Sequence, residues 1–120
     1  MARILIVDDE SLIRDVLRVI CETHGHEVVE AENGDQGIDK ARSETPNLII
    51  LDMNMPNMTG WEVIPLLRSH PDTKAVPVIA MTADASAESR EEAHNAGCDR
   101  YITKPIDAKR LNAVMDELIG

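Results

Sequence analysis

Short apolar runs alternate with stretches of helical periodicity along the whole sequence, and this alternation limits the folds open to the chain. Three runs, at 4–7, 48–51 and 76–80, are apolar enough for strands buried on both faces of a sheet. Two weaker runs, at about 28–29 and 100–102, contain polar neighbours and predict outer strands. Pro77 cannot donate a ladder hydrogen bond, so we expect it at the first residues of its strand.

The stretches between these runs carry apolar residues at the spacing of a helix face. Gly25 is typical of a residue that ends a helix, and Asp107 is a candidate N-cap. Pro65 is tolerated only near the first turn of its helix, because it lacks a backbone N–H. The five predicted helices cover residues 11–24, about 35–44, about 61–69, 86–96 and 108–119.

Five strands alternating with five helices predict an α/β fold, a doubly wound parallel sheet with helices on both faces. A chain of 120 residues has room for one such domain, so we expect residues 1–120 to form a single unit. In folds of this kind the working site lies beyond the carboxyl ends of the strands. The residues that follow each apolar run are therefore the candidates for function.

The helix predicted at 86–96 differs from the others because it has only alanines to bury. An alanine methyl gains little free energy from burial, so this helix should be the most loosely attached. The sequence thus predicts one helix that can shift at low cost.

Acidic residues outnumber basic ones by 22 to 12, which gives a net charge of −10. This excess argues against nucleic acid or an anionic membrane as the main partner, because phosphates are bound by clustered lysine and arginine. Because Pro77 interrupts the run at 76–80, no uninterrupted apolar run exceeds four residues, so neither a membrane span nor a signal peptide is predicted. Cys21 and Cys98 stand alone and are interpreted as buried small hydrophobic residues. These features predict a cytoplasmic protein.

Polar residues with complementary chemistry follow the strands at the predicted working edge. With the five runs counted in chain order, Asp8 and Asp9 follow the first run, Asp52 the third, Thr82 the fourth and Lys104 the fifth. Three crowded carboxylates repel one another, and Mg²⁺, a hard cation that prefers oxygen ligands, would neutralise them. Lysine and threonine can contact phosphoryl oxygens. The set predicts a phosphoryl-transfer site with an aspartate nucleophile.

The order and positions of these motifs resemble the receiver domain of two-component response regulators, of the chemotaxis-regulator type, over essentially the whole chain. The resemblance implies a flavodoxin-like sheet with strand order 2-1-3-4-5. The matching residues are the pair Asp8-Asp9, Asp52 with Met55-Pro56 and Gly60 after it, Thr82-Ala83, and Lys104-Pro105.

The resemblance further implies a phosphorelay function. Asp52 would accept the phosphoryl group from a phosphohistidine of a sensor histidine kinase or phosphotransfer protein. Mg²⁺ would be bound directly by Asp9 and Asp52, by the backbone carbonyl of Asn54, and by Asp8 through water. Such a chain is a phosphoacceptor switch that helps catalyse its own phosphorylation and dephosphorylation, rather than an enzyme with a metabolite substrate.

The switching residues are implied in the same way. Lys104 would contact the phosphoryl oxygens, and its peptide bond to Pro105 would be cis. On phosphorylation Thr82 would move toward the new oxygens and Tyr101 would rotate inward, remodelling the face made by the fourth helix, fifth strand and fifth helix for a downstream protein target. The side chains of Asn54 and Asp84 flank the approach of water, so we expect them to tune the phosphoryl lifetime.

Other interpretations of these residues are simpler. The acids that follow the first strand could cap the first helix, where negative charge complements the helix dipole. His24 and His26 have no evident acid or cysteine partner in the sequence, so a solvated turn is preferred to a metal site. Trp61 is interpreted as part of the core rather than as a contact for a partner.

Three rival functions share part of this pattern. A flavin-binding relative would need a Ser/Thr/Gly-rich phosphate loop where Asp8 and Asp9 stand. A haloacid-dehalogenase-like phosphatase would carry its nucleophile after the first strand. A receiver-like interaction module that works without phosphorylation stays open as the alternative, although such modules normally lack one of the motif residues. We expect no effector domain within residues 1–120, and a stand-alone regulator and a receiver excised from a longer protein are both compatible with the sequence.

Overall fold

Five parallel strands form the central sheet of the computed structural model, which describes residues 2–120. Their spatial order is β2-β1-β3-β4-β5, which confirms the predicted flavodoxin-like arrangement. The elements in chain order are β1 (Arg3–Val7), α1 (Ser11–Thr23), β2 (Glu27–Ala31), α2 (Gly34–Glu44), β3 (Leu48–Asp52), α3 (Gly60–Arg68), β4 (Val78–Thr82), α4 (Ala87–Ala96), β5 (Arg100–Thr103) and α5 (Ala108–Ile119).

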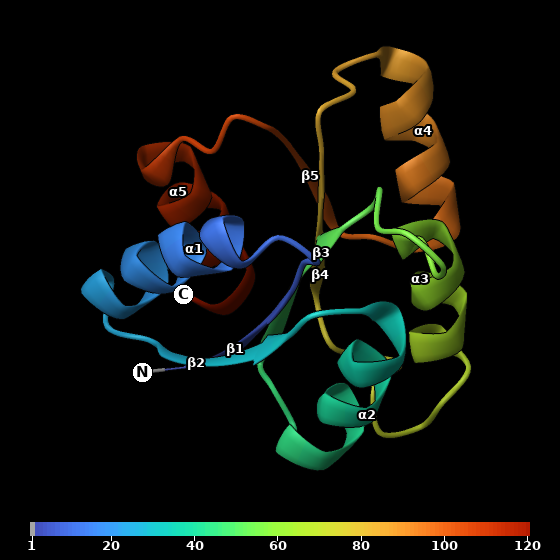
Figure 1. Cartoon of the computed structure of the whole chain (residues 1–120), viewed down its shortest axis with the longest axis horizontal. Coiled ribbons are helices and arrows are strands. Elements are labelled where there is room, and N and C mark those ends of the chain that lie inside the picture. Colours follow the sequence, from blue (N-terminus) through green and yellow to red (C-terminus); the bar gives the residue numbers. More distant parts are fainter. Residues whose placement is uncertain (1) are drawn as a thin grey trace.

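Helices cover both faces of the sheet, with α1 and α5 on one side and α2, α3 and α4 on the other (Figure 1). The alternation of side chains along β1 explains this division, because Ile4 and Ile6 lie in the core cluster beside α1 and α5. Leu5 and Val7 lie in the opposite cluster. All residues of β3 and β4 are buried, as expected for central strands with both faces covered.

The fourth strand begins two residues later than predicted, at Val78. Pro77 therefore precedes the strand instead of lying within it, and its carbonyl still accepts a hydrogen bond from the backbone N–H of Ile49. The shift makes Thr82 the last residue of the strand. Pro65 also differs from the prediction, since it lies in the second turn of α3 rather than in the first.

The helix ends follow local sequence signals. The Asp107 carboxylate accepts hydrogen bonds from the backbone N–H groups of Lys109 and Arg110, which confirms the predicted N-cap of α5. Gly25 follows α1 with a φ of +90°, a conformation that glycine adopts without strain. None of the helices described for residues 2–120 combines the length and apolar character that spanning a lipid bilayer requires.

Both cysteines pack as small apolar residues. Cys21 is fully buried and Cys98 nearly so. Burial raises the pKa of the Cys21 thiol to about 12 and that of Cys98 to about 11, so both thiols stay protonated at neutral pH. The interpretation of both residues as core side chains is confirmed.

Candidate functional site

The carboxyl ends of β1, β3 and β5 bring three of the predicted site residues into contact. The Lys104 ammonium nitrogen lies 3.5 Å from Oδ2 of Asp8 and 3.6 Å from Oδ1 of Asp52. Asp52 is the last residue of β3 and Asp8 directly follows β1, and these two strands are hydrogen-bonded neighbours. One lysine thus bridges two carboxylates from adjacent strands.

Both carboxylates are almost completely removed from water. Only 1% of Asp8 and 3% of Asp52 is exposed. Burial raises the pKa of both groups above the usual aspartate value, and the hydrogen bonds from the backbone N–H groups of Glu10 and Asn54, together with the charge of Lys104, partly oppose the rise. The site therefore carries more buried negative charge than one lysine neutralises.

The acids that follow β1 form a group of oxygen atoms that could hold a cation. Carboxylate oxygens of Asp8, Asp9 and Glu10 lie within 4.8 Å of one another, and Asp9 and Glu10 are exposed. Mg²⁺ prefers a few carboxylate oxygens together with retained water, so a partly open group of acids fits this ion. Within residues 2–120 this is the only group of three or more such side chains.

The same acids stand at the start of α1, where the simpler interpretation makes them helix caps. Glu10 occupies the N-cap position of α1, and its side chain accepts no capping hydrogen bond. The Asp8 carboxylate instead accepts from the backbone N–H of Glu10 at 2.9 Å, which turns the chain between β1 and α1. The negative charges of these acids still complement the dipole of α1 at its start, so this role and a role in the site are compatible.

Asn54 connects the end of β3 to the end of β4. Its backbone N–H donates to Oδ1 of Asp52 at 3.0 Å, and its side-chain amide donates to Oγ1 of Thr82 at 2.7 Å. The backbone N–H of Asp84 donates to the same Thr82 oxygen at 3.2 Å. Asn54 was predicted to lie beside the site, but its hydrogen bond to Thr82 was not predicted.

A close approach of two backbone segments holds the loop that follows Asp52. The Gly60 N–H donates to the Met53 carbonyl at 3.2 Å as the chain folds back into α3. A Cβ atom at position 60 would lie 2.7 Å from Cα of Met53 and 2.9 Å from the carbonyl oxygen of Asp52. Only glycine fits there, which gives a physical reason for the glycine of the motif.

Tyr101 lies farther from the carboxylates, on β5. Its hydroxyl donates to the carbonyl oxygen of Asp84 and lies 2.8 Å from Oγ of Ser89 in α4. The Arg90 guanidinium stands 5.6 Å from the centre of the Tyr101 ring. Tyr101 therefore contacts both the segment after β4 and α4. The contact with Ser89 was not anticipated from the sequence.

A cis peptide bond and a cavity also lie at this edge of the sheet. The peptide bond between Lys104 and Pro105 is cis. A cavity of about 320 Å³ opens beside Thr82 between α3 and α4, and Trp61 and Glu88 line it. Trp61 is half-buried and also packs against the core, in agreement with its interpretation as a core residue.

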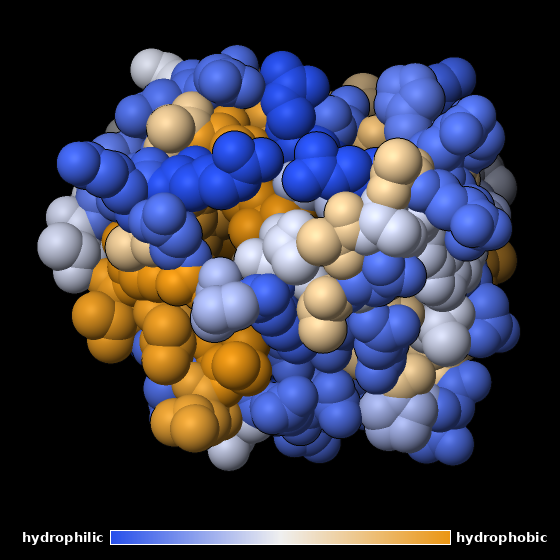
Figure 2. All heavy atoms as spheres, turned by 90° about the horizontal axis from the view of Figure 1, so that it is seen from above, coloured by the Kyte–Doolittle hydropathy of each residue, from blue (hydrophilic) through white to orange (hydrophobic). Residues whose placement is uncertain are grey.

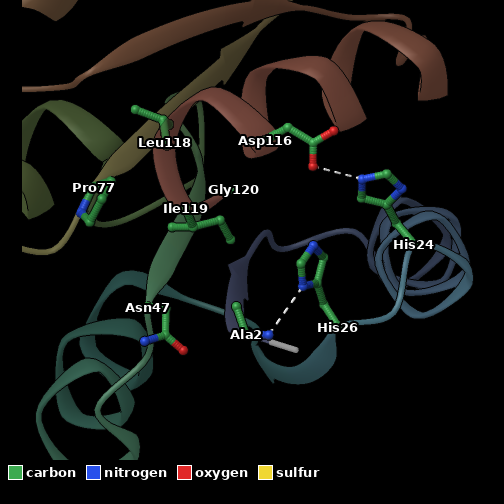
Figure 3. A pocket seen from close by; sticks show the side chains of 9 residues that line it. All are labelled: Ala2, His24, His26, Asn47, Pro77, Asp116, Leu118, Ile119 and Gly120. Atoms are coloured by element: carbon green, nitrogen blue, oxygen red, sulfur yellow. Dashed lines mark hydrogen bonds and ion pairs between the residues drawn. The ribbon is translucent and has the colours of Figure 1, made fainter.

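A second cavity, of about 600 Å³, lies near both chain ends, and Figure 3 shows His24 and His26 in its wall. His24 Nε2 lies 2.9 Å from Oδ1 of Asp116 in α5, so the expectation that His24 lacks an acid partner was wrong. His26 Nδ1 accepts a hydrogen bond from the backbone N–H of Ala2 at 3.2 Å. Each histidine thus has a partner within the fold.

The outer face of α1 presents exposed apolar side chains. Leu12 is 71% exposed, Val16 42% and Val19 62%. Their spacing places them along one side of the helix, and Figure 2 shows apolar side chains gathered at the lower left, over α1. This patch begins two residues after Glu10, next to the acidic edge of the sheet.

Comparison with known sequences agrees with this geometry. The family described as response regulator receiver domain matches residues 4–116. Protein PilH of Pseudomonas aeruginosa is 38% identical over 119 residues, covering 96% of this chain and 98% of its own length. The polar-differentiation response regulator DivK of Brucella anthropi is 33% identical over 117 residues, covering 98% of this chain and 95% of its own.

Solved structures show the same fold. Chemotaxis protein CheY4 of Vibrio cholerae superimposes with a TM-score of 0.93 at 30% identity, over 99% of both chains. The receiver domain of sensor histidine kinase PA1611 of Pseudomonas aeruginosa, described with a magnesium ion coordinated in its active-site cleft, gives 0.91 at 27% identity over 99% of this chain and 98% of its own. On its sequence, fold and strand-end motifs, the chain belongs to the response regulator receiver domain family of two-component signalling.

Proposed function

We propose that Asp52 is the phosphoacceptor of a phosphorelay and that the chain acts as a switch rather than as an enzyme with a metabolite substrate. The observation that carries the proposal is the buried Asp52 carboxylate, which lies beside Lys104 and accepts the N–H of Asn54. Both of these groups contact Oδ1, so we assign Oδ2 as the attacking oxygen. A carboxylate held in this way is oriented before the donor arrives.

The donor in this proposal is a phosphohistidine of a sensor kinase or phosphotransfer protein. Oδ2 of Asp52 forms a bond to phosphorus as the phosphorus–nitrogen bond breaks, and the imidazole nitrogen that leaves takes up a proton. Lys104 then contacts an oxygen of the transferred group, and the hydroxyl of Thr82 donates to another. Hydrolysis of the acyl phosphate by water returns the Asp52 carboxylate and inorganic phosphate.

Mg²⁺ is the cofactor that the acidic edge fits. Asp9 and Asp52 would bind it directly, with the backbone carbonyl of Asn54, and Asp8 would contact it through water. Of these residues, Asp8 and Asp9 belong to the group of carboxylates that follows β1. When bound, the ion neutralises negative charge on the carboxylates and on the incoming phosphoryl group. The excess buried negative charge of Asp8 and Asp52 supports this assignment.

The partners are proteins. The apolar patch of Leu12, Val16 and Val19 on α1 adjoins the acceptor site, so we assign it to docking of the phosphodonor. The downstream protein target would bind the face made by α4, β5 and α5, which contains Tyr101. Asn54 and Asp84 flank the approach of water to the acyl phosphate and would set its lifetime.

Incubation with acetyl phosphate and Mg²⁺, read by intact mass, tests the proposal. We expect the wild-type chain to gain one phosphoryl group and Asp52→Asn to gain none. Asp39→Asn, which removes an exposed carboxylate from α2, is the matched control and should behave as wild type. No gain on wild type, or an equal gain on Asp52→Asn, would overturn the assignment of Asp52.

A second measurement separates a switch from an interaction module that works without phosphorylation. Beryllofluoride imitates the acyl phosphate without transferring a group. A switch should bind its downstream partner with different affinities in the presence and absence of beryllofluoride and Mg²⁺, because a ligand shifts an equilibrium only by its preference for one state. Equal affinities would favour the module.

A further inference from the structure

Asn54 contacts the phosphoacceptor and the switch threonine at the same time, through two different groups. Its backbone N–H bonds to Asp52, while its side-chain amide bonds to Oγ1 of Thr82 at 2.7 Å. The backbone contact survives any substitution other than proline, whereas the amide contact depends on the side chain. The two roles of residue 54 can therefore be separated by mutation.

The hydroxyl of Thr82 has both of its acceptor positions occupied. A hydroxyl offers two lone pairs and one proton, and Asn54 and the backbone N–H of Asp84 each donate to this oxygen. Thr82 is only 2% exposed, so water does not readily replace either donor. These two bonds fix the position of the oxygen and leave its proton as the only group available to a new acceptor.

We propose that the amide of Asn54 is a positioning group that holds Thr82 in its resting place and so sets the free-energy gap between the resting and switched states. The inference rests on the proposed function, in which Thr82 moves toward the phosphoryl group. That movement requires the 2.7 Å contact to lengthen or break. The contact is therefore specific to the resting state, and its loss favours the switched one.

The same bonds connect Asn54 to α4. Asp84 donates its N–H to Thr82 and accepts the hydroxyl of Tyr101 at its carbonyl. The Tyr101 hydroxyl in turn lies 2.8 Å from Oγ of Ser89. A displacement of Thr82 therefore reaches α4 through the backbone of one residue, Asp84, and through one tyrosine, without any change in the apolar core.

The expected effect is that of one neutral hydrogen bond. Such a bond changes an equilibrium by about three- to tenfold. Asn54 is itself exposed, so removal of its amide leaves no buried cavity and the variant should fold. The change should therefore appear in the switch equilibrium, and the thermal midpoint of unfolding should fall by only a few degrees, as expected for the loss of one hydrogen bond.

Amide hydrogen exchange of the unphosphorylated, metal-free protein tests the proposal directly. In Asn54→Ala the Asp84 amide should exchange about three to ten times faster than in wild type, because its acceptor Thr82 is less firmly held. Asn57→Gly is the matched control. It removes an amide from the same loop at a residue with a φ of +67°, where glycine is unstrained, and should leave Asp84 unchanged. Equal exchange in Asn54→Ala and wild type would overturn the proposal.

A double-mutant comparison shows whether the effect passes through the hydroxyl. In a Thr82→Val background, Asn54→Ala should have no further effect on exchange at Asp84. A further increase as large as that in the wild-type background would show that the amide acts by another route and would overturn the proposal. Asn54→Ala should also lower the beryllofluoride concentration needed for half-saturation by about three- to tenfold.

These outcomes are distinguishable from a failure of the proposed function. If Asp52 is not a phosphoacceptor, the wild-type chain gains no mass with acetyl phosphate and does not respond to beryllofluoride. In that case the exchange rate of the Asp84 amide in the unphosphorylated protein still shows whether the hydrogen bond from Asn54 positions Thr82.

Discussion

Helices α4 and α5 precede and follow β5 in the chain, and they are held in different ways. α5 buries three large apolar side chains, those of Leu111, Val114 and Met115. α4 buries only Ser89 and Ala93. Hydrophobic area therefore fixes α5, whereas α4 is attached by a small methyl group and by the hydrogen bond between the hydroxyls of Ser89 and Tyr101. A helix of the second kind can be repositioned by exchange of a few polar contacts, which suits it to respond to Thr82.

Because α4 and α5 are held differently, truncation of a buried side chain should lower the free energy of unfolding much more in α5 than in α4. Leu111→Ala should lower the free energy of unfolding by about 2–5 kcal/mol, because Leu111 is fully buried and its removal leaves a cavity. Ala93→Gly in α4 should cost about 1 kcal/mol, mainly through helix propensity. Urea denaturation of both variants measures the two values. An equal loss in the two helices would contradict the distinction between them.

Much of this contrast could be predicted from the sequence. The alternation of apolar runs and helical patterns was sufficient to predict all five strands and five helices, because the burial of strands and of helix faces leaves a strong periodic pattern along the sequence. Residues 86–96 have only alanines as apolar side chains to bury, which already indicated a weakly attached helix. Ala93 is buried as expected. The strand order, by contrast, came from the resemblance to a known family.

Contacts between side chains distant in sequence were not predictable. Asn54 and Thr82 are 28 residues apart, and His24 and Asp116 are 92 apart, so only the folded chain brings each pair together. Neither pair leaves a periodic signal, because a polar residue at a strand or helix end fits many arrangements. The late start of β4 was missed because Val76 and Pro77 extend its apolar run, although the proline precedes the ladder. The sequence thus located the site without its internal hydrogen bonds.

Amide exchange measures how firmly α4 is held without any mutation. The core amides of α4 should exchange at least about tenfold faster than those of residues 12–21 in α1, because local opening of α4 exposes little apolar surface. α1 buries Leu17 and Cys21 completely and serves as the well-anchored reference. Hydrogen exchange measured by NMR gives both sets of rates in one experiment. Exchange in α4 as slow as in α1 would show that hydrogen bonds anchor it as firmly as apolar packing does.

The smallest predicted effect on stability is that of Ser89→Ala. The lost hydrogen bond to Tyr101 costs about 1 kcal/mol, and the higher helix propensity of alanine offsets about half of it. The free energy of unfolding should thus change by less than about 1 kcal/mol, whereas the Tyr101 ring loses its contact with α4. Tyr101 is the only tyrosine, so 3-fluorotyrosine labelling gives a single ¹⁹F resonance for it.

That resonance should shift or broaden in Ser89→Ala and stay unchanged in Ser43→Ala, which truncates an exposed hydroxyl in α2. Arg90 remains near the ring in both variants, so a change reports on the lost hydroxyl contact rather than on the neighbouring charge. An unchanged resonance in Ser89→Ala would mean that the carbonyl of Asp84 alone positions the tyrosine. Tyr101 would then respond to Thr82 through the β4–α4 segment only, and α4 would be free of the hydrogen bond that distinguishes its attachment from that of α5.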